Sequence, residues 1–301
     1  MRPINLFRNL LFIILVLTAS KAHGELSQKQ ARKLISGAAG LELPNKAVRV
    51  GAIRQVSSSV AETSAEIELV FRLTQNQQGS WRIVEIRSGQ DKWEELELIA
   101  RAAKAELPKA DCDAPELFQP RSKSSDPSVK RARCLIAKLF AVRLPSDAVR
   151  VKEVSALALP LGSQPSATAV AIVQIEARFG TNEHQWRLVE FRSGDRGWLN
   201  LENLPTAVNQ AKRAKASEEL ETIAHALEAF RRDRGFFIVS EKNSVLIDHL
   251  SPQYLSTIIR FDPWHKPYQY KGERDHFSLR STGPDGISNT ADDIVVTDSS
   301  R

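Results

Sequence analysis

The sequence predicts an α+β protein made of two tandem repeated modules and a separate C-terminal domain. Residues 28–106 and 129–209 are copies of one unit. Within each copy, helical spacing of apolar residues changes to polar–apolar alternation and back again. In each module we expect a helix, a three-stranded antiparallel sheet and a helix. After the second copy, one apolar helical stripe precedes short strand-like segments, which predicts a long helix packed on a small antiparallel sheet.

The chain begins with the pattern of a cleaved secretory signal peptide over residues 1–24. Arg2 and Arg8 supply positive charge, residues 10–17 are apolar, and small residues follow up to Gly24. The apolar run is shorter than the ~20 residues that a membrane-spanning helix needs. We therefore expect a periplasmic or secreted protein, which would contact a membrane only through an uncleaved leader.

The overall charge of the 301 residues gives no sign of nucleic-acid binding. The formal net charge is +6. Arg2, Arg8 and Lys21 account for three of these charges, so +3 remains once the leader is removed. A nucleic-acid surface needs a basic face with stacking aromatic residues, and the sequence shows neither. We expect protein partners and no nucleic acid.

The first module, residues 25–107, shows its expected elements in order. Its opening helix carries Ala31, Leu34, Ile35 and Ala38 at helical spacing. The apolar residues of the three expected strands are Val48, Val50 and Ile53, then Ile67, Leu69 and Phe71, then Trp81 and Ile83. A polar turn at residues 75–79 separates the last two strands, and residues 94–106 favour a closing helix.

Regular alternation in the third strand places Trp81, Ile83, Glu85 and Arg87 on one face, with Val84 and Ile86 on the other. Glu85 and Arg87 could line a pocket. The commoner arrangement is a cross-strand ion pair on the surface.

The second module, residues 129–210, repeats the first. Residues 148–151 repeat 47–50, and residues 186–194 repeat 81–89. Four tryptophans recur at matching places, Trp81, Trp93, Trp186 and Trp198. They could stack on a ligand, although core packing is the more frequent use of such residues.

Residues 108–128 are rich in Pro and Ser and form a linker between the modules. Cys112 lies in this linker and Cys134 in the helix that follows. These are the two cysteines of the chain. In an oxidising compartment they could form a disulfide, and two unpaired thiols are an equally weighted alternative.

Residues 211–301 form the C-terminal domain. Its long helix carries an apolar stripe of Leu220, Ile223, Leu227 and Phe230. Glutamates lie early in this helix and arginines late, which suits the helix dipole, and Gly235 marks the end. Four aromatic residues are expected in the core of the small sheet, namely Trp264, Tyr268, Tyr270 and Phe277.

An ordered set of motifs gives this domain a family resemblance. The set comprises Arg-Asp-Arg-Gly at 232–235, Tyr-Leu at 254–255, Asp-Pro-Trp at 262–264, Ser-Thr-Gly-Pro-Asp-Gly at 281–286 and Asp-Asp at 292–293. It resembles the C-terminal domain of the major pseudopilin of type II secretion systems, the G subunit. The chain departs from that family before the helix, where residues 203–215 are polar and the family has an apolar membrane-inserting segment.

The resemblance implies a structural role and a calcium site. It implies Asp285, Asp292 and Asp293 as side-chain ligands, with Leu279 and Ser281 giving backbone carbonyls. Calcium takes ~6–8 oxygen ligands of these types. Without the resemblance, aspartates at turn positions would be the simpler explanation of the same loop.

These observations lead to two functional hypotheses. The first is a non-enzymatic extracytoplasmic protein with a calcium-stabilised pseudopilin-like domain, which contacts secretion or pilus components as an accessory. The alternative is a ligand-binding protein that acts through the tryptophan-bearing repeats. The sequence contains no recognised catalytic motif, so we expect no enzyme activity.

Overall fold

The computed structural model describes residues 25–38, 42–90, 92–105, 107, 112, 127–140, 148–158, 164–182 and 185–298. The expected signal peptide at 1–24 and most of the expected linker at 108–128 lie outside these residues. The chain divides into two compact units. Unit 1 combines Leu107–Glu202 with the chain up to Leu96, and unit 2 combines Glu97–Glu106 with Asn203–Arg301.

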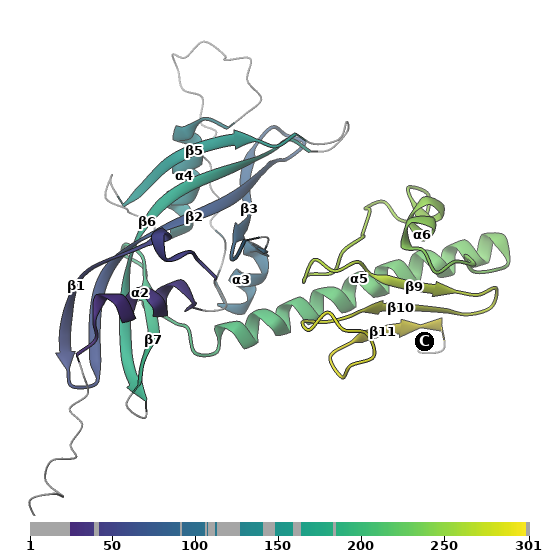
Figure 1. Ribbon diagram of the computed structural model, residues 1–301. Helices are drawn as coiled ribbons and strands as arrows, with labels where there is room; N and C mark the ends of the chain where they lie inside the picture. Colours follow the sequence, from purple (N-terminus) through teal and green to yellow (C-terminus); the bar gives the residue numbers. More distant parts are fainter. Residues whose placement is uncertain are drawn as a thin grey trace, which may run out of the picture. The chain divides into compact units, whose positions relative to one another are not determined.

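Unit 1 contains one eight-stranded antiparallel sheet, to which both repeats contribute (Figure 1). The first repeat supplies α2 (Gln28–Ser36), β1 (Val48–Ser57), β2 (Val60–Gln75), β3 (Trp81–Arg87) and β4 (Trp93–Glu95). Its closing helix, α3 (Leu96–Ala102), is assigned to unit 2 from Glu97 onward. The second supplies α4 (Val129–Phe140), β5 (Val149–Ala156), β6 (Ser166–Asn182), β7 (Gln185–Arg192) and β8 (Leu199–Asn200). The mixed α+β class is confirmed, and each repeat adds a short fourth strand, β4 or β8, to the three expected.

The long strands β2 and β6 join the two repeats. They pair antiparallel from Val60 opposite Gly180 to Thr74 opposite Ser166. Ile67 lies opposite Val173 in this ladder. The repeat-related residues Val48 and Val149 pair with Ile67 and Val173 respectively. An approximate two-fold axis therefore passes between Ile67 and Val173 and relates one repeat to the other.

The core of unit 1 lies on one face of this sheet, because alternate residues of β2 and β6 point to the same side. The buried residues on that face include Ile67, Leu69, Phe71, Val173, Ile175 and Phe179. Helices α2 and α4 cover it with Ala31, Ile35, Ala132, Leu135 and Ile136. Helix α2 packs on β1 and also on β7, whereas α4 packs on β5 and also on β3. Each repeat thus completes its core with elements of the other.

A β-bulge changes the expected faces of β3. Arg72 lies opposite Glu85 and Leu73 opposite Ile83, so Val84 is an extra residue in the ladder. Trp81 and Ile83 face the core and so does Ile86, whereas Glu85 lies on the other face with Arg72. The expectation that Trp81, Ile83 and Glu85 share a face is wrong, because regular alternation stops at the bulge. Strand β7 has the same bulge at Val189, between Leu188 and Glu190.

Cys112 and Cys134 form a disulfide with a Cα–Cα distance of 6.0 Å. Of the two alternatives that the sequence left open, the structure therefore has the disulfide and not two unpaired thiols. Cys112 packs against the unit 1 core, so the bond anchors a point of the linker beside α4.

Loss of this disulfide is expected to destabilise unit 1 by about 3 kcal/mol, because the closed loop restricts the unfolded chain. The bridged residues are separated by 22 positions. The Cys112→Ser/Cys134→Ser variant should unfold at lower denaturant concentration than the oxidised protein. Adding a reductant should shift the wild type and leave the double variant unchanged. Equal unfolding midpoints for the oxidised wild type and the variant would contradict the prediction.

Unit 2 contains a long helix and a small antiparallel sheet, as predicted. Its elements are α5 (Leu204–Arg234), α6 (Asn243–Leu250), β9 (Gln269–Gly272), β10 (Phe277–Ser281) and β11 (Ile294–Thr297), and the strand order is β11-β10-β9. Gly235 ends α5 with a φ of 80°, a left-handed conformation that favours glycine. In the part of the chain that the structure describes, no helix combines the length and apolar character needed to cross a membrane.

The apolar stripe of α5 packs on this sheet. Leu220, Ile223, Leu227 and Phe230 are all buried in one core with Tyr268, Tyr270 and Phe277. Trp264 lies outside that core, contrary to expectation, and its indole N–H donates to Asn209 Oδ1 at 3.2 Å. The turn that begins at Asp262 directs Trp264 away from the sheet, because the Asp262 carboxylate accepts the N–H groups of Trp264 and Lys266.

Candidate functional site

The candidate site is the loop between β10 and β11, which contains Asp285, Asp292 and Asp293. The sheet fixes both ends of this loop, because Ser281 at the end of β10 pairs with Ile294 at the start of β11. Bonds within the loop and to neighbouring elements then set the position of each carboxylate.

Asp292 is held at three points. Its Oδ1 accepts the Thr290 hydroxyl at 2.6 Å, and its Oδ2 accepts the N–H of Asp285 at 3.2 Å. Its carbonyl oxygen accepts Arg213 from α5 at 2.8 Å. The Thr290 hydroxyl bond, with the N–H of Asp285, lowers the pKa of Asp292 against the opposing effect of desolvation. These carboxylate bonds therefore stabilise the loop above the ordinary carboxyl pKa, and the contribution is lost as pH falls through the lowered folded pKa.

Asp293 is paired with an arginine of the neighbouring strand. Its side chain is 7% exposed, and its Oδ2 lies 3.3 Å from the Arg280 guanidinium. The same oxygen accepts the N–H of Asn289 at 2.8 Å, and Arg280 also donates to Asn289 Oδ1 at 2.6 Å. A cation of the protein thus already contacts one of the expected calcium ligands.

Asp285 lies at the exposed side of the loop, where its Oδ1 accepts the N–H of Ile287 at 2.7 Å. Close by, Gly283 has a φ of 62° and leaves room for Asp292. A Cβ at Gly283 would come within 2.6 Å of the Asp292 carbonyl oxygen and 2.7 Å of its Oδ2. Only glycine therefore fits this position without moving Asp292.

The two expected carbonyl donors lie in β10. Leu279 is in the middle of this central strand, with a fully buried side chain. Ser281 is also buried, and its hydroxyl donates to Asp262 Oδ2 at 2.6 Å. Asp262 is 3% exposed and links the Asp-Pro-Trp turn to the base of the loop. Sequence reasoning assigned no role to Asp262, although its place before Pro263 marked it as a turn residue.

The donor chemistry of this loop suits calcium, because its ligand candidates are all oxygens and Gly283 keeps one face of Asp292 clear. The carboxylates themselves are used for bonds inside the protein. Among the described residues, no three His, Cys, Asp or Glu side chains are gathered in a way that could hold a metal.

In unit 1 the structure places the four tryptophans in two settings. Trp81 is buried in the core and Trp186 packs against it. Trp93 lies under the Arg72 guanidinium, 4.1 Å from the ring centroid, and Trp198 lies under Arg178 at 4.0 Å. Thus two rings serve the core and the other two stack with arginines of the protein itself.

The glutamates of the bulged strands have ion-pair partners on the neighbouring strands. Glu85 pairs with Arg72, and Glu190 pairs with Arg178 at 2.6 Å. Arg178 also bonds Glu62 at 2.9 Å and lowers the pKa of that carboxyl. All of these are ion pairs between residues that lie opposite each other on neighbouring strands.

Part of this chain matches a known protein family. Residues 203–297 match the family described as type II secretion system (T2SS), protein G. Curated proteins and solved structures gave no match. The match begins at the residue before α5 and extends to the end of β11, so it covers the helix, the sheet and the Asp-containing loop. Over residues 203–297, this protein is therefore similar to protein G of type II secretion systems, as the ordered motifs of its C-terminal domain predicted.

Proposed function

We propose that this protein is a non-enzymatic, extracytoplasmic accessory of type II secretion machinery, and that its C-terminal domain contacts secretion components. The observation that supports this most directly is the family match over residues 203–297, which spans a domain with its own core. Large apolar side chains on its surface would suit protein contacts, since Val239, Ile258 and Phe261 are 66%, 55% and 57% exposed.

Crosslinking in envelope extracts tests this role. The full chain should capture type II secretion components identified by mass spectrometry, and a chain that lacks residues 203–301 should not. Ile258→Ser/Phe261→Ser should reduce capture if these side chains take part in the contact. Recovery of no secretion component by the full chain would overturn the proposal.

We also propose that the β10–β11 loop binds calcium. Asp285, Asp292 and Asp293 would supply carboxylates, and Leu279 and Ser281 would supply carbonyl oxygens. The ion would supply positive charge to a loop in which three aspartates lie within nine residues. It would hold β10 and β11 together next to Ser281 and Ile294, the last pair of residues in their ladder before the loop.

Calcium is expected to raise the unfolding temperature of unit 2 in the full chain, by an amount that corresponds to about 2.7 kcal/mol at a hundredfold excess over the dissociation constant. Differential scanning calorimetry with calcium, and then with a chelator, measures the shift. Asp285→Ala should lose it. Asp275→Ala is the matched control, because Asp275 is exposed in the β9–β10 turn, away from the loop. Equal shifts in both variants would refute the site.

Arg280→Gln is expected to strengthen calcium binding several-fold, because it removes a positive charge 3.3 Å from Asp293. Without calcium the same change should lower the stability of unit 2, since Asp293 loses its ion-pair partner. Isothermal titration with calcium chloride and calorimetry in chelator measure the two effects. Lys271→Gln, which removes an exposed charge on β9, is the control. Weaker calcium binding by Arg280→Gln would contradict this expectation.

A further inference from the structure

A second feature, in unit 1, arises from the way the repeats meet. Residues 47–50 and 148–151 are repeats of the same sequence, so Arg49 and Arg150 occupy equivalent places on β1 and β5. The approximate two-fold axis at Ile67 and Val173 brings them to the same region of the sheet. Both side chains point to the face opposite the core, since their neighbours Val48 and Val149 are buried.

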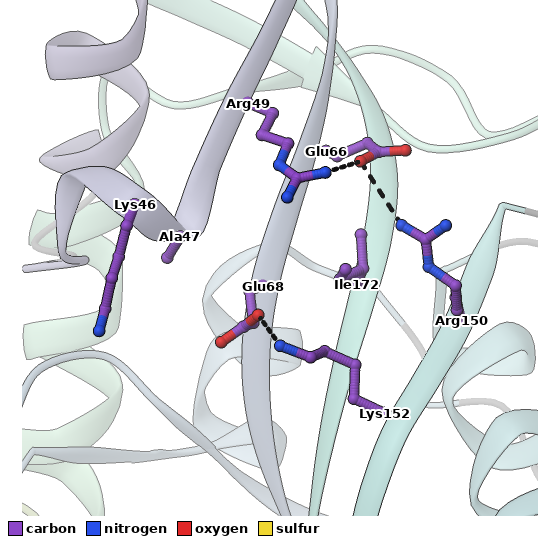
Figure 2. Close-up of a pocket in the computed structure, with 8 residues that line it drawn as sticks. All are labelled: Lys46, Ala47, Arg49, Glu66, Glu68, Arg150, Lys152 and Ile172. Atoms are coloured by element: carbon purple, nitrogen blue, oxygen red, sulfur yellow. Dashed lines mark hydrogen bonds and ion pairs between the residues drawn. The ribbon is translucent and has the colours of Figure 1, made fainter.

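The two arginines have unequal partners. Arg49 lies opposite Glu66 on β2, but the equivalent residue opposite Arg150 on β6 is Ile172. Both guanidinium groups therefore approach the single carboxylate of Glu66, from opposite sides (Figure 2). Their nitrogens are 4.0 and 3.7 Å from Glu66 Oε2, which is beyond hydrogen-bond length. Within the described part of the chain, neither guanidinium donates a hydrogen bond, so both retain N–H groups for another acceptor.

These residues line a pocket of about 210 Å³. Its charged side chains are Lys46, Arg49, Arg150, Lys152, Glu66 and Glu68. Lys152 is paired with Glu68 at 2.8 Å, whereas Lys46 has no ion pair among the described residues. The lining thus carries four cations and two carboxylates, a surplus of two positive charges.

We propose that this pocket binds a small polyvalent oxyanion, a phosphate group or a di- or tricarboxylate, between Arg49 and Arg150. Guanidinium groups bind carboxylates and phosphates through paired N–H donors, which these two arginines have available. The volume lies below the ~300–1,000 Å³ of pockets for drug-sized ligands, so a small anion fits better. The site adds a binding activity of the repeats to the proposed role of the C-terminal domain and does not depend on it.

The test is isothermal titration of the full chain with pyrophosphate and with citrate, in calcium-free buffer at about 20 mM salt, where surface charges are weakly screened. Wild type should bind one or both, and the two probes separate phosphate from carboxylate chemistry. Arg49→Gln/Arg150→Gln should weaken binding by about tenfold or more. Lys29→Gln/Lys33→Gln removes two exposed charges from α2 and is the matched control, expected to bind as wild type does.

Glu66→Gln provides a second test with the opposite sign. It should strengthen anion binding, because the competing carboxylate becomes neutral while the two arginines stay. Glu25→Gln, an exposed change of the same charge elsewhere in unit 1, should have no effect. The proposal is overturned if wild type binds neither probe, or if Lys29→Gln/Lys33→Gln weakens binding as much as Arg49→Gln/Arg150→Gln does. Circular dichroism of each variant confirms that it is folded.

Discussion

A chain shortened to the first repeat, residues 25–107, is expected not to persist as a folded monomer. In the full protein, β2 pairs with β6 from Val60 to Thr74, and α2 packs on β7. The shortened chain would leave that edge of β2 unpaired and would expose part of the core around Leu69 and Phe71. Long unpaired apolar edges associate with other strands. Because the repeat axis passes beside Ile67, a second copy of β2 could take the place of β6, so a symmetric dimer is the expected folded form.

Light scattering after size exclusion, together with circular dichroism, tests this expectation. Residues 25–202 are the matched control, because they keep all eight strands that the two repeats contribute to the sheet. This longer chain should be a folded monomer, whereas residues 25–107 should be dimeric, aggregated or unfolded. A folded monomer of residues 25–107 would show that one repeat forms a sufficient core by itself.

Phe237→Ala is expected to destabilise unit 2 by about 3–5 kcal/mol, the usual cost of removing a fully buried phenylalanine. Phe237 is fully buried, and its ring lies edge-on to Phe277 with a centroid distance of 4.9 Å. The Arg231 guanidinium covers the ring at 4.7 Å. A cavity between α5 and the small sheet would remain, since these elements cannot close over the space without moving the helix.

The neighbouring residue provides a control of the same chemistry. Phe236 is 37% exposed, so Phe236→Ala removes the same atoms with less buried surface and should cost clearly less than Phe237→Ala. Calorimetry of the full chain measures both variants through the transition of unit 2. Similar losses of stability in the two variants would show that Phe237 is not part of the core in solution.

The regular parts of this fold could be predicted from sequence. Residues buried on one face recur at every second position in a strand and at every third or fourth position in a helix. The alternation in β2 and the stripe of α5 both appear as buried residues on one side. The bulge at Val84 was missed, since a period-two pattern assumes one residue per step. The sequence does contain an indication of the bulge, because the apolar Ile86 follows Ile83 by three residues, which breaks the alternation. In β7, Phe191 follows Leu188 by the same interval.

The sequence contains no comparable pattern for pairing between strands that are far apart in the chain. The sequence marked two similar modules but contained nothing that set β2 against β6, since register between distant strands depends on the whole sheet. In the same way, the resemblance identified the aspartates of the β10–β11 loop but gave no reason to connect them with Arg213 or Asp262. Arg213 lies 79 positions from Asp292 in sequence, and only the packing of α5 brings them together.

The central pairing of the large sheet also affects the time course of folding. Val70 pairs with Val170, so the middle of the sheet closes only after a loop of 100 residues has been gathered. Hairpins such as β2–β3 join residues close in the chain and can form much sooner, whereas distant contacts slow folding. In a newly made chain, hairpins such as β2–β3 would therefore form before β2 pairs with β6. Until then, one edge of β2 stays unpaired. During that interval, slow synthesis of the second repeat would leave this edge of β2 unpaired for longer and favour pairing between neighbouring chains.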